Sequence, residues 1–350
     1  MDDLMRALAL TRRPAPGTLA DSIGMSEIAE PRPGFRDVLV RVLASTINID
    51  DIHVAEGTFY GGIPIGPRPR PGRPVTPGSD LSGVVIGAGK GVRSLHAGDA
   101  VFGVQIPFRS KGAWAEICAI DERWLTPKPD NVPFPCAAAC GISGLVALSA
   151  IRALKLRRGS RIVVVGATGG IGGMAVQFAT RAGAEVIGVC GPAHVDRAYQ
   201  LGCSLVLDYK TQPWEREIST HIDGVLDLVG GGDVEHAGRS VLDRDGIFVT
   251  VVGPERFIGD RPLGWTGIVR VLATVGWRIV KSRFRGPRYV LTGPGAGAGR
   301  DLRKVAEAAA TGILPPIDST VPFALQPMRQ ALRRAAEHRN NGRIVVDMTR

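Results

Sequence analysis

The chain has 350 residues, of which 44% are hydrophobic and 22% charged, and this length allows two domains that each bury a core. Its 43 Lys and Arg against 33 Asp and Glu give a formal net charge of +10, which favours anionic ligands. The sequence carries no Cys/His finger and no aromatic ribonucleoprotein motif, so we expect no nucleic-acid partner.

The five cysteines are irregularly spaced, which does not suggest a disulfide framework. Residues 1–14 lack the apolar stretch of a signal peptide, and no run of 18 uninterrupted apolar residues occurs. We therefore expect a soluble protein in a reducing, cytoplasmic compartment.

The first third of the chain carries short runs of alternating apolar and polar residues, with clusters of Pro and Gly between them. This pattern predicts strands joined by turns. The predicted strands span residues 4–10, 38–45, 83–86, 100–104 and 113–120.

From about residue 133 the pattern changes to a helix-length run of small and apolar residues, 136–154. Five strand-like runs follow, and helical patterns separate the first few of them. Those runs span residues 161–165, 185–189, 205–207, 224–229 and 247–252. Strands that alternate with helices predict βαβ units and a parallel sheet, so the fold class is α/β. Residues 253–299 are less regular, and beyond them we expect a helix over 301–310 and then a strand, a helix and a strand over 320–323, 327–338 and 343–347.

The most specific motif is Gly166-Ala-Thr-Gly-Gly-Ile-Gly172, which follows the strand 161–165 and precedes a helical pattern. Glycine permits the unusual φ of such a turn, lets a pyrophosphate approach the bare backbone, and lets the helix pack closely on the strand. The helix N-terminus then offers free N–H groups to the phosphates. In this context the motif predicts a dinucleotide-binding site.

The end of the second strand of this unit predicts which nicotinamide cofactor is bound. Sites for NAD usually have an acid there, about 20 residues after the glycine motif, to bind the ribose 2′-hydroxyl. Here the strand ends in Cys190-Gly191-Pro192, with no carboxylate to repel a 2′-phosphate. The cationic or ionisable residues His194, Arg197 and Lys210 follow, and cations stabilise the extra phosphate. We therefore expect NADPH, although His194 could equally be a solvated helix residue.

Several further runs occur in a characteristic order along the chain. They are Met5-Arg-Ala-Leu-Ala-Leu, Asn48-Ile-Asp-Asp-Ile-His-Val-Ala-Glu-Gly57, Pro77-Gly-Ser-Asp-Leu-Ser-Gly-Val-Val, His96-Ala-Gly-Asp-Ala-Val-Phe-Gly, Gly112-Ala-Trp-Ala-Glu, Asp208-Tyr-Lys, Asp227-Leu-Val-Gly-Gly and Gly342-Arg-Ile-Val-Val. With the glycine loop, they resemble the medium-chain dehydrogenase/reductase superfamily, in its zinc-independent, quinone-oxidoreductase-like branch, over essentially the whole chain. The run from Gly264 to Trp277 is also similar to the reticulon-4-interacting protein subgroup.

The resemblance implies a GroES-like β-barrel domain for substrate over residues 1–132, with 313–350 returning to it, and a Rossmann domain for NADPH over 133–312. It also implies a cofactor cleft between the domains and a homodimer. By position, Thr168, Gly169, Gly170 and Ile171 would contact the pyrophosphate, Gly191, His194 and Tyr209 the adenosine phosphate region, and Asn48 and Ser143 the nicotinamide ribose. Arg197 and Gly253 complete the set of candidate cofactor-binding residues. The family often has Ser or Thr where Gly191 stands, so one hydrogen bond to the 2′-phosphate is expected to be missing.

No metal site is expected. Zinc members of the superfamily use Cys, His and Glu ligands, whereas the matching positions here are Asp50-Asp51 and Ser79-Asp80. Catalytic zinc needs three suitable protein ligands and structural zinc needs four. Cys136 and Cys140, four apart on an Ala-rich helix, are interpreted as small buried residues.

Two residues are candidates for delivering a proton after hydride transfer. The family often has Tyr where His53 stands, and histidine changes charge near physiological pH. Tyr60 is the other candidate. Either residue could instead only line the cleft, and the change from Tyr to His leaves the transferred role open.

The segment from Arg270 to Arg288 alternates six cationic residues with Val, Leu, Trp and Phe. It could contact an anionic membrane, cap the substrate cleft, or form a dimer edge or a solvated face.

These observations predict an NADPH-dependent reductase of small-molecule quinones or α,β-unsaturated carbonyl compounds, which transfers hydride without a metal. The alternatives are an enoyl-thioester reductase and an NADPH-binding redox sensor or interaction protein without turnover.

Overall fold

The computed structural model describes residues 3–59, 66–105, 111–211, 213–219, 221–256, 259–260, 262–294 and 298–349. The chain forms two compact units. Unit 1 comprises Met1–Ile142, Gly259–Pro262 and Gly297–Arg350, and unit 2 comprises Ser143–Ile258 and Leu263–Ala296. The units therefore divide at residues other than 132 and 312, and the helix before residue 312 groups with unit 1.

Unit 1 is built on a sheet with the strand order β14-β15-β3-β4-β5-β7, and β6 pairs with β3 as well. Its strands are β3 (Asp37–Ile47), β4 (Asp80–Ala88), β5 (Ala100–Val104), β6 (Ile117–Asp121), β7 (Leu125–Pro127), β14 (Ile317–Pro322) and β15 (Arg343–Asp347). A separate antiparallel pair is formed by β1 (Leu4–Ala9) and β2 (Gly24–Ala29). Because β15 pairs antiparallel with β3, the C-terminal strand completes a sheet that the first third of the chain begins.

In the part of unit 1 that the structure describes, four α-helices accompany these strands. They are α1 (Leu19–Ser22), α2 (Ile49–Glu56), α9 (Ala298–Ala310) and α10 (Leu325–Ala336). The amphipathic helix α10 places Met328 and Leu332 in the same core cluster as Val40, Leu81 and Trp114. This apolar burial fixes the C-terminal helix near α2, whose residues contribute to the candidate site.

Unit 2 contains a six-stranded sheet with the order β10-β9-β8-β11-β12-β13. Its strands are β8 (Arg161–Val165), β9 (Glu185–Cys190), β10 (Leu205–Asp208), β11 (Gly224–Asp227), β12 (Ile247–Thr250) and β13 (Arg288–Leu291). All five neighbouring pairs are parallel. Numbered within the unit, this order is 3-2-1-4-5-6, the Rossmann topology, which confirms the predicted α/β fold class.

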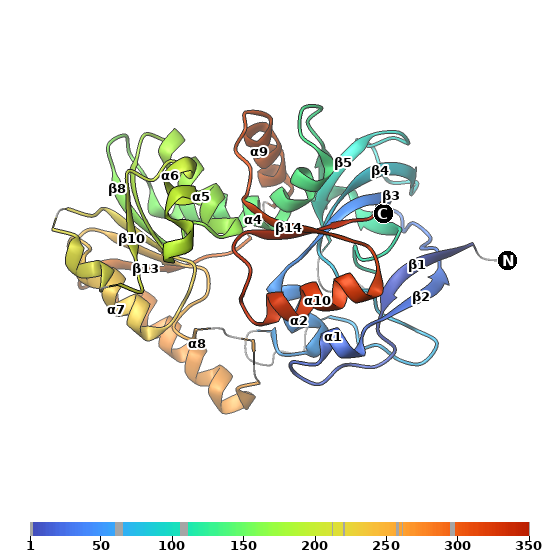
Figure 1. Cartoon of the computed structure of the whole chain (residues 1–350), viewed down its shortest axis with the longest axis horizontal. Helices are drawn as coiled ribbons and strands as arrows, with labels where there is room; N and C mark the ends of the chain where they lie inside the picture. Colours follow the sequence, from blue (N-terminus) through green and yellow to red (C-terminus); the bar gives the residue numbers. More distant parts are fainter. Residues whose placement is uncertain are drawn as a thin grey trace. The chain divides into compact units, whose positions relative to one another are not determined.

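Helices cover both faces of this sheet, as Figure 1 shows, with α5 and α6 on one face and α7 and α8 on the other. They are α5 (Gly170–Arg181), α6 (Val195–Leu201), α7 (Gly232–Ser240) and α8 (Gly264–Lys281). The predicted strands of this unit are present with ends shifted by a few residues, whereas α8 and β13 were not predicted. Both lie in the stretch 253–299, where the sequence pattern was considered irregular.

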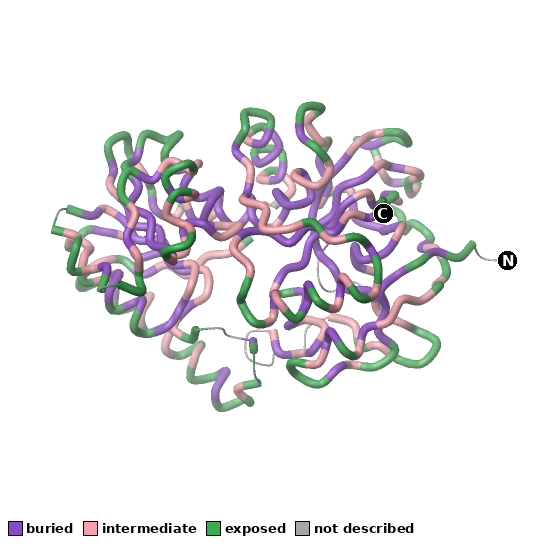
Figure 2. The backbone as a smooth tube through the Cα atoms, viewed as in Figure 1, coloured by how far each residue is buried: buried purple, intermediate pink, exposed green. Residues whose placement is uncertain are grey.

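The helix α4 (Phe134–Leu154) runs from unit 1 into unit 2. Among the described residues, it is the helix that is long and apolar enough to cross a membrane by length and composition, but 61% of its apolar window is buried in the protein. Figure 2 shows the buried backbone of both units, with exposed residues at the turns. The burial of α4 is that of a core helix.

Candidate functional site

The glycine loop of unit 2 joins β8 to α5 with the geometry that the motif predicts. Gly166 has φ +86°, a left-handed conformation that favours glycine. A Cβ atom on Gly172 would lie 2.0 Å from the carbonyl oxygen of Gly166, so only glycine allows the first turn of α5 to pass this close to the loop. Both glycines are therefore required by the backbone path itself.

The N-terminus of α5 is capped by Gly169, which has no side chain to accept the N–H groups of the first turn. These are the groups of Gly170, Ile171 and Gly172. The residues Gly169, Gly170 and Ile171 are partly exposed, whereas Thr168 is buried. The helix thus presents uncapped donors and a partial positive charge at the surface, and a pyrophosphate fits such a cradle.

The next two strands bring Gly191 and Tyr209 together at the same edge of the sheet. Asp208 of β10 is in register with Cys190 of β9, so the residues that follow each strand are neighbours. A Cβ atom on Gly191 would lie 3.7 Å from the Tyr209 ring, an ordinary contact, and Tyr209 is 56% exposed. His194 and Arg197 follow in the 3-10 helix η2 (Pro192–His194) and in α6. This edge therefore gathers the residues predicted for the adenosine phosphate.

Sequence reasoning missed a carboxylate at this edge. Asp208 ends β10, and its charge adds to burial in raising the pKa of the Cys190 thiol to about 11, so the carboxylate lies near the end of β9. One of its oxygens accepts a hydrogen bond of 2.9 Å from the backbone N–H of Lys210. This carboxylate belongs to the third strand of the unit, whereas the sequence argument considered only acids at the end of the second strand.

Asp227, the last residue of β11, forms hydrogen bonds to the loop after β11 and to the end of β12. Its Oδ1 accepts the backbone N–H groups of Val229 and Gly230 at 2.9 and 2.8 Å, and its Oδ2 accepts the Thr250 hydroxyl at 2.9 Å. The same Thr250 hydroxyl oxygen accepts the N–H of Gly253 at 3.0 Å. Asp227 therefore ties together the loops after β11 and β12, and it positions the candidate residue Gly253, whose φ is +92°. In the sequence, an acid at the end of a buried strand and shortly before two glycines could have indicated that Asp227 orders these loops.

Ser143 is fully buried at the start of unit 2, and its hydroxyl makes no hydrogen bond with the described residues. A buried hydroxyl without a partner is uncommon, and one explanation is a group that this chain does not itself supply. The resemblance assigned Ser143 to the nicotinamide ribose, and the missing partner is consistent with that assignment.

In unit 1, Asn48 lies in a buried polar network. It caps α2, and its side-chain amide donates to the Ser79 hydroxyl at 2.9 Å and to the carboxylates of Asp51 and Asp80 at 3.2 and 3.1 Å. The guanidinium of Arg343 donates to the Asn48 side-chain oxygen. Asn48 was predicted to contact the nicotinamide ribose. Both the nitrogen and the oxygen of its side-chain amide are hydrogen-bonded within unit 1.

Asp80 is the centre of this network. Its Oδ2 accepts from the Thr46 hydroxyl at 2.7 Å and from the Arg343 guanidinium at 2.6 Å, and its Oδ1 accepts the N–H of Ile142 at 2.8 Å. Burial, followed by the neighbouring Asp80 charge, raises the pKa of Asp51 to about 7. The network therefore pairs the Arg343 cation with the Asp80 carboxylate, and the neighbouring Asp51 binds its proton more readily than usual.

His53, one turn further along α2, is 4% exposed. Its Nε2 lies 3.2 Å from one carboxylate oxygen of Asp260, and Nε2 of His338 lies 3.1 Å from the other. The His338 side chain is 31% exposed, so Asp260 connects a buried imidazole to one that reaches solvent. The other candidate, Tyr60, lies outside the described residues.

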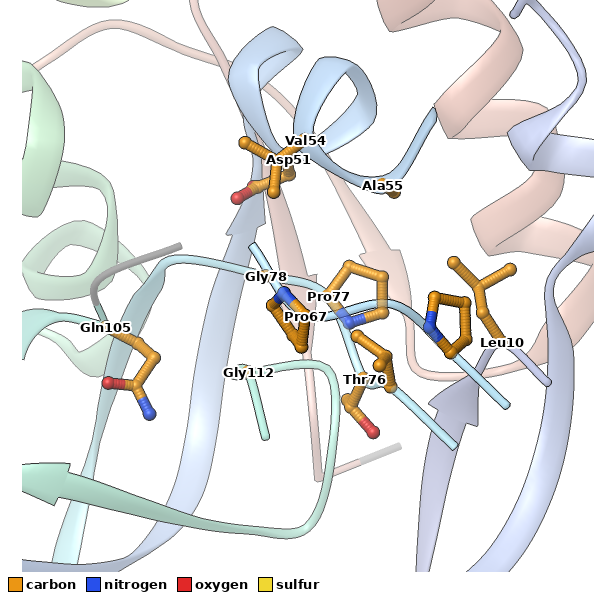
Figure 3. Close-up of a pocket in the computed structure, with 12 residues that line it drawn as sticks. Leu10, Asp51, Val54, Ala55, Pro67, Thr76, Pro77, Gly78, Gln105 and Gly112 are labelled. Carbon is orange, nitrogen blue, oxygen red and sulfur yellow. The ribbon is translucent and has the colours of Figure 1, made fainter. Parts of the chain in front are cut away.

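A small cavity in unit 1 lies beside α2 (Figure 3). It is lined mainly by apolar groups such as Leu10, Val54 and Pro77, with the Asp51 side chain at one side. Its volume is about 30 Å³, enough for a water molecule and far less than the 300 Å³ or more of typical ligand pockets. This cavity does not accommodate a quinone or an enone.

The described residues contain no group of three or more His, Cys, Asp and Glu side chains that could hold a metal ion. All five cysteines are free; Cys140 is buried and Cys136 is half-buried. Burial raises the pKa of both thiols, which disfavours the thiolate that zinc requires.

Two family models match the chain. The model for the alcohol dehydrogenase GroES-like domain matches residues 34–130, and the model for zinc-binding dehydrogenases matches residues 201–346. Although the second name implies zinc, the residues present do not fit it, because the Arg343 guanidinium is the cation that Asn48 and Asp80 hold. The GroES-like match confirms the predicted fold of the first domain.

Curated relatives support the same grouping. The bovine (Bos taurus) mitochondrial NAD(P)H oxidoreductase RTN4IP1 is 29% identical over 334 residues, covering 89% of this chain and 82% of that protein. The Arabidopsis thaliana chloroplast envelope quinone oxidoreductase homolog is 34% identical over 191 residues, covering 53% of this chain and 56% of that protein.

Among solved structures, the quinone oxidoreductase of Coxiella burnetii has a TM-score of 0.77, with 21% identity over 99% of this chain and 100% of that one. At this identity the likeness shows the fold alone. The strand order of unit 2, the two family models and the curated relatives agree with one another and with the motifs of the sequence. The chain belongs to the medium-chain dehydrogenase/reductase superfamily, in its quinone-oxidoreductase-like branch.

Proposed function

We propose that the protein is an NADPH-dependent reductase of quinones or α,β-unsaturated carbonyl compounds that transfers hydride without a metal ion. The observation that carries this proposal is the bare N-terminus of α5, where a glycine cap and three glycines in the first turns leave backbone donors for a pyrophosphate. The names of the relatives agree with it, since they are an NAD(P)H oxidoreductase and quinone oxidoreductase homologues.

The preference for NADPH rests on the end of β9. Gly191 contributes no carboxylate, and His194, Arg197 and Tyr209 follow β9 and β10, where we expect the 2′-phosphate to lie. Asp208 is the opposing charge, but one of its oxygens is engaged by the Lys210 backbone. Cations and a phenol hydroxyl favour a phosphate by charge-assisted hydrogen bonds.

The chemistry that NADPH supplies when bound is hydride donation to an electron-poor carbon. The residues of this chain then have to hold the partners, exclude water and deliver a proton. We assign proton delivery to His53, because Asp260 fixes its ring and links it to His338, which reaches solvent. The metal-free character rests on the Arg343 guanidinium, which occupies the place beside Asp80 and Asn48. The homodimer and the cytoplasmic location expected from the sequence remain predictions.

The test measures cofactor binding and turnover separately. Calorimetry with NADPH and with NADH should give the tighter dissociation constant for NADPH. Oxidation of NADPH, followed by absorbance, should then occur with a panel of quinones and enones, less with crotonyl-CoA, and not without an acceptor. Tight NADPH binding without turnover on any acceptor would instead indicate a sensor or interaction protein, and binding of neither cofactor would refute the proposal.

A further inference from the structure

The helix α8 packs on unit 2 through one face only. Gly267, Ile268 and Val275 are buried, and Val275 belongs to the core cluster that also contains Phe248 and Tyr289. On the same side, the Arg278 guanidinium lies 2.9 Å from the carboxylate of Glu235. These contacts fix the orientation of the helix on the unit.

The other face of α8 is apolar and exposed. The described residues include eleven exposed large hydrophobic side chains, and six of them lie on α8 or on the turn after it. These six are Trp265 (78% exposed), Val269 (60%), Leu272 (61%), Trp277 (66%), Val280 (50%) and Phe284 (81%). Figure 2, with α8 located from Figure 1, shows long exposed stretches along this helix. We call these six residues the α8 face; such a contiguous apolar surface indicates an interaction site.

The segment of the chain that carries the α8 face has charged residues of a single sign. Residues 261–300 contain eight Lys and Arg and no Asp or Glu. Five of these cations are exposed beside the face: Arg270, Lys281, Arg283, Arg285 and Arg288. A nearby acid, Asp245, lies next to Arg244 in the hollow that Arg283 and Arg288 also line. Two copies of the chain that met through this face would bring like charges together, which disfavours a second copy as the occupant.

We propose that the α8 face docks on the surface of a lipid bilayer that contains anionic lipid. An interfacial helix of this kind has an apolar side with Trp, Phe and Leu and a flanking set of Lys and Arg. Its 18 residues span about 27 Å in the plane of the membrane. Trp265 and Trp277 would lie at headgroup level, where an indole buries its ring and keeps its N–H hydrated, and the cations would contact lipid phosphates.

Flotation of the full chain with vesicles tests the apolar part of this proposal. Vesicles of phosphatidylcholine alone are compared with vesicles that also contain phosphatidylglycerol. We expect the chain to float with the anionic vesicles and the double variant W265S/L272S to lose at least about tenfold in partitioning. The matched control is L4S, which removes a side chain that is likewise 61% exposed but lies on β1.

A second pair of variants tests the charge. Lys281→Glu with Arg283→Glu should lower partitioning by about 100-fold, because each reversal removes an attraction between a cation and the anionic surface and adds a repulsion. The control reverses two exposed cations of α9, Arg303→Glu with Lys304→Glu, and should change partitioning little beyond the effect of net charge. Binding of the unaltered chain should weaken as salt rises.

Tryptophan fluorescence locates the contact on the chain. Trp114 and Trp214 are buried, whereas Trp265 and Trp277 are exposed. Anionic vesicles should shift the emission to shorter wavelength and brominated lipid should quench it, and both effects should be absent in W265F/W277F. NADPH oxidation without vesicles should be unchanged in all these variants, so the outcome is independent of the proposed function.

Four results would overturn the docking proposal. One is equal recovery from neutral and anionic vesicles; another is an equal loss in L4S and W265S/L272S. In the third, the chain does not bind vesicles, and sedimentation shows a dimer that the W265S/L272S substitutions dissociate. That result would assign the α8 face to a second copy of the chain. Binding only to an acidic polypeptide, without vesicle binding, would likewise refute it.

Discussion

The guanidinium of Arg343 donates a hydrogen bond of 2.6 Å to the carboxylate of Asp80, a residue that lies 263 positions earlier in the chain. Their side chains are 10% and 0% exposed. The pair joins the last strand to β4 in the interior of unit 1, and it provides a buried cation next to Asn48.

Replacing Arg343 by Met should destabilise the protein by about 3–5 kcal/mol, because it leaves the buried Asp80 carboxylate without its partner. Urea unfolding measures the change. The matched control is Arg339→Met, which removes an arginine that is 74% exposed and paired with Glu337, and should cost less than about 1 kcal/mol. The double variant D80N/R343M should recover part of the loss; equal midpoints for R343M and R339M would contradict the role of the pair.

The raised pKa of Asp51 should make stability depend on pH. Burial and the Asp80 charge raise this pKa to about 7, so the folded protein holds the proton more strongly than the unfolded chain. The stabilisation is then complete below about pH 4 and is lost as the pH rises through about 7. Asp51→Asn should flatten this dependence. Between pH 4 and 8, the free energy of unfolding of the unaltered chain should fall by at most about 4 kcal/mol relative to that of the D51N variant.

Urea midpoints at pH 4, 5, 6, 7 and 8 check this prediction, with the exposed Asp196→Asn as the control. Parallel curves for the unaltered chain and D51N would show that Asp51 does not bind this proton.

Gly172→Ala should abolish the cradle for the pyrophosphate. The new Cβ would lie 2.0 Å from the Gly166 carbonyl oxygen, so the first turn of α5 has to move. We expect the affinity for NADPH to fall by at least about tenfold, since the bare donors no longer converge. Calorimetry measures the affinity, and circular dichroism verifies folding. Gly276→Ala on α8, where a Cβ meets nothing within 4 Å, should leave NADPH binding intact.

Gly191 should control the choice between NADPH and NADH. Its φ of −80° suits any residue, and a Cβ there makes only an ordinary contact with Tyr209. Gly191→Ser should strengthen NADPH binding several-fold, by one hydrogen bond to the 2′-phosphate. Gly191→Asp should weaken it by roughly 10- to 100-fold and favour NADH, because a carboxylate repels the phosphate and binds the free hydroxyl. If both variants keep the original ratio of the NADPH and NADH dissociation constants, the 2′-phosphate does not bind beside Gly191.

His53→Phe should lower kcat by about 100-fold or more if this imidazole delivers the proton. The dependence of kcat on pH should flatten, and the dissociation constant of NADPH should stay the same. The comparison is His338→Phe, which leaves His53 and Asp260 in place and should have a smaller effect. Unchanged turnover and an unchanged pH profile in H53F would remove His53 from the reaction.

The sequence by itself determined the features that consecutive residues encode. A β-branched strand, a run of glycines and a helical pattern in immediate succession predicted the loop from Gly166 to Gly172, because each residue there is constrained by its nearest neighbours. The alternation of strands and helices likewise predicted the parallel sheet. The helix α8 was not predicted, although its apolar and cationic residues lie on different sides. Part of its apolar side, such as Val275, is buried in the core, and part, such as Leu272, is exposed.

Only the tertiary structure decided which distant residues meet. Asn48 was predicted at the cofactor, but its amide is engaged by Asp80 and Arg343, and His53 was predicted without Asp260 or His338 as partners. Pairings of this kind depend on the packing of β15 against β3 and on the position of the turn at Gly259 and Asp260. A buried charge takes its partner from whichever segment the fold brings near, and the local pattern of residues carries no record of that segment.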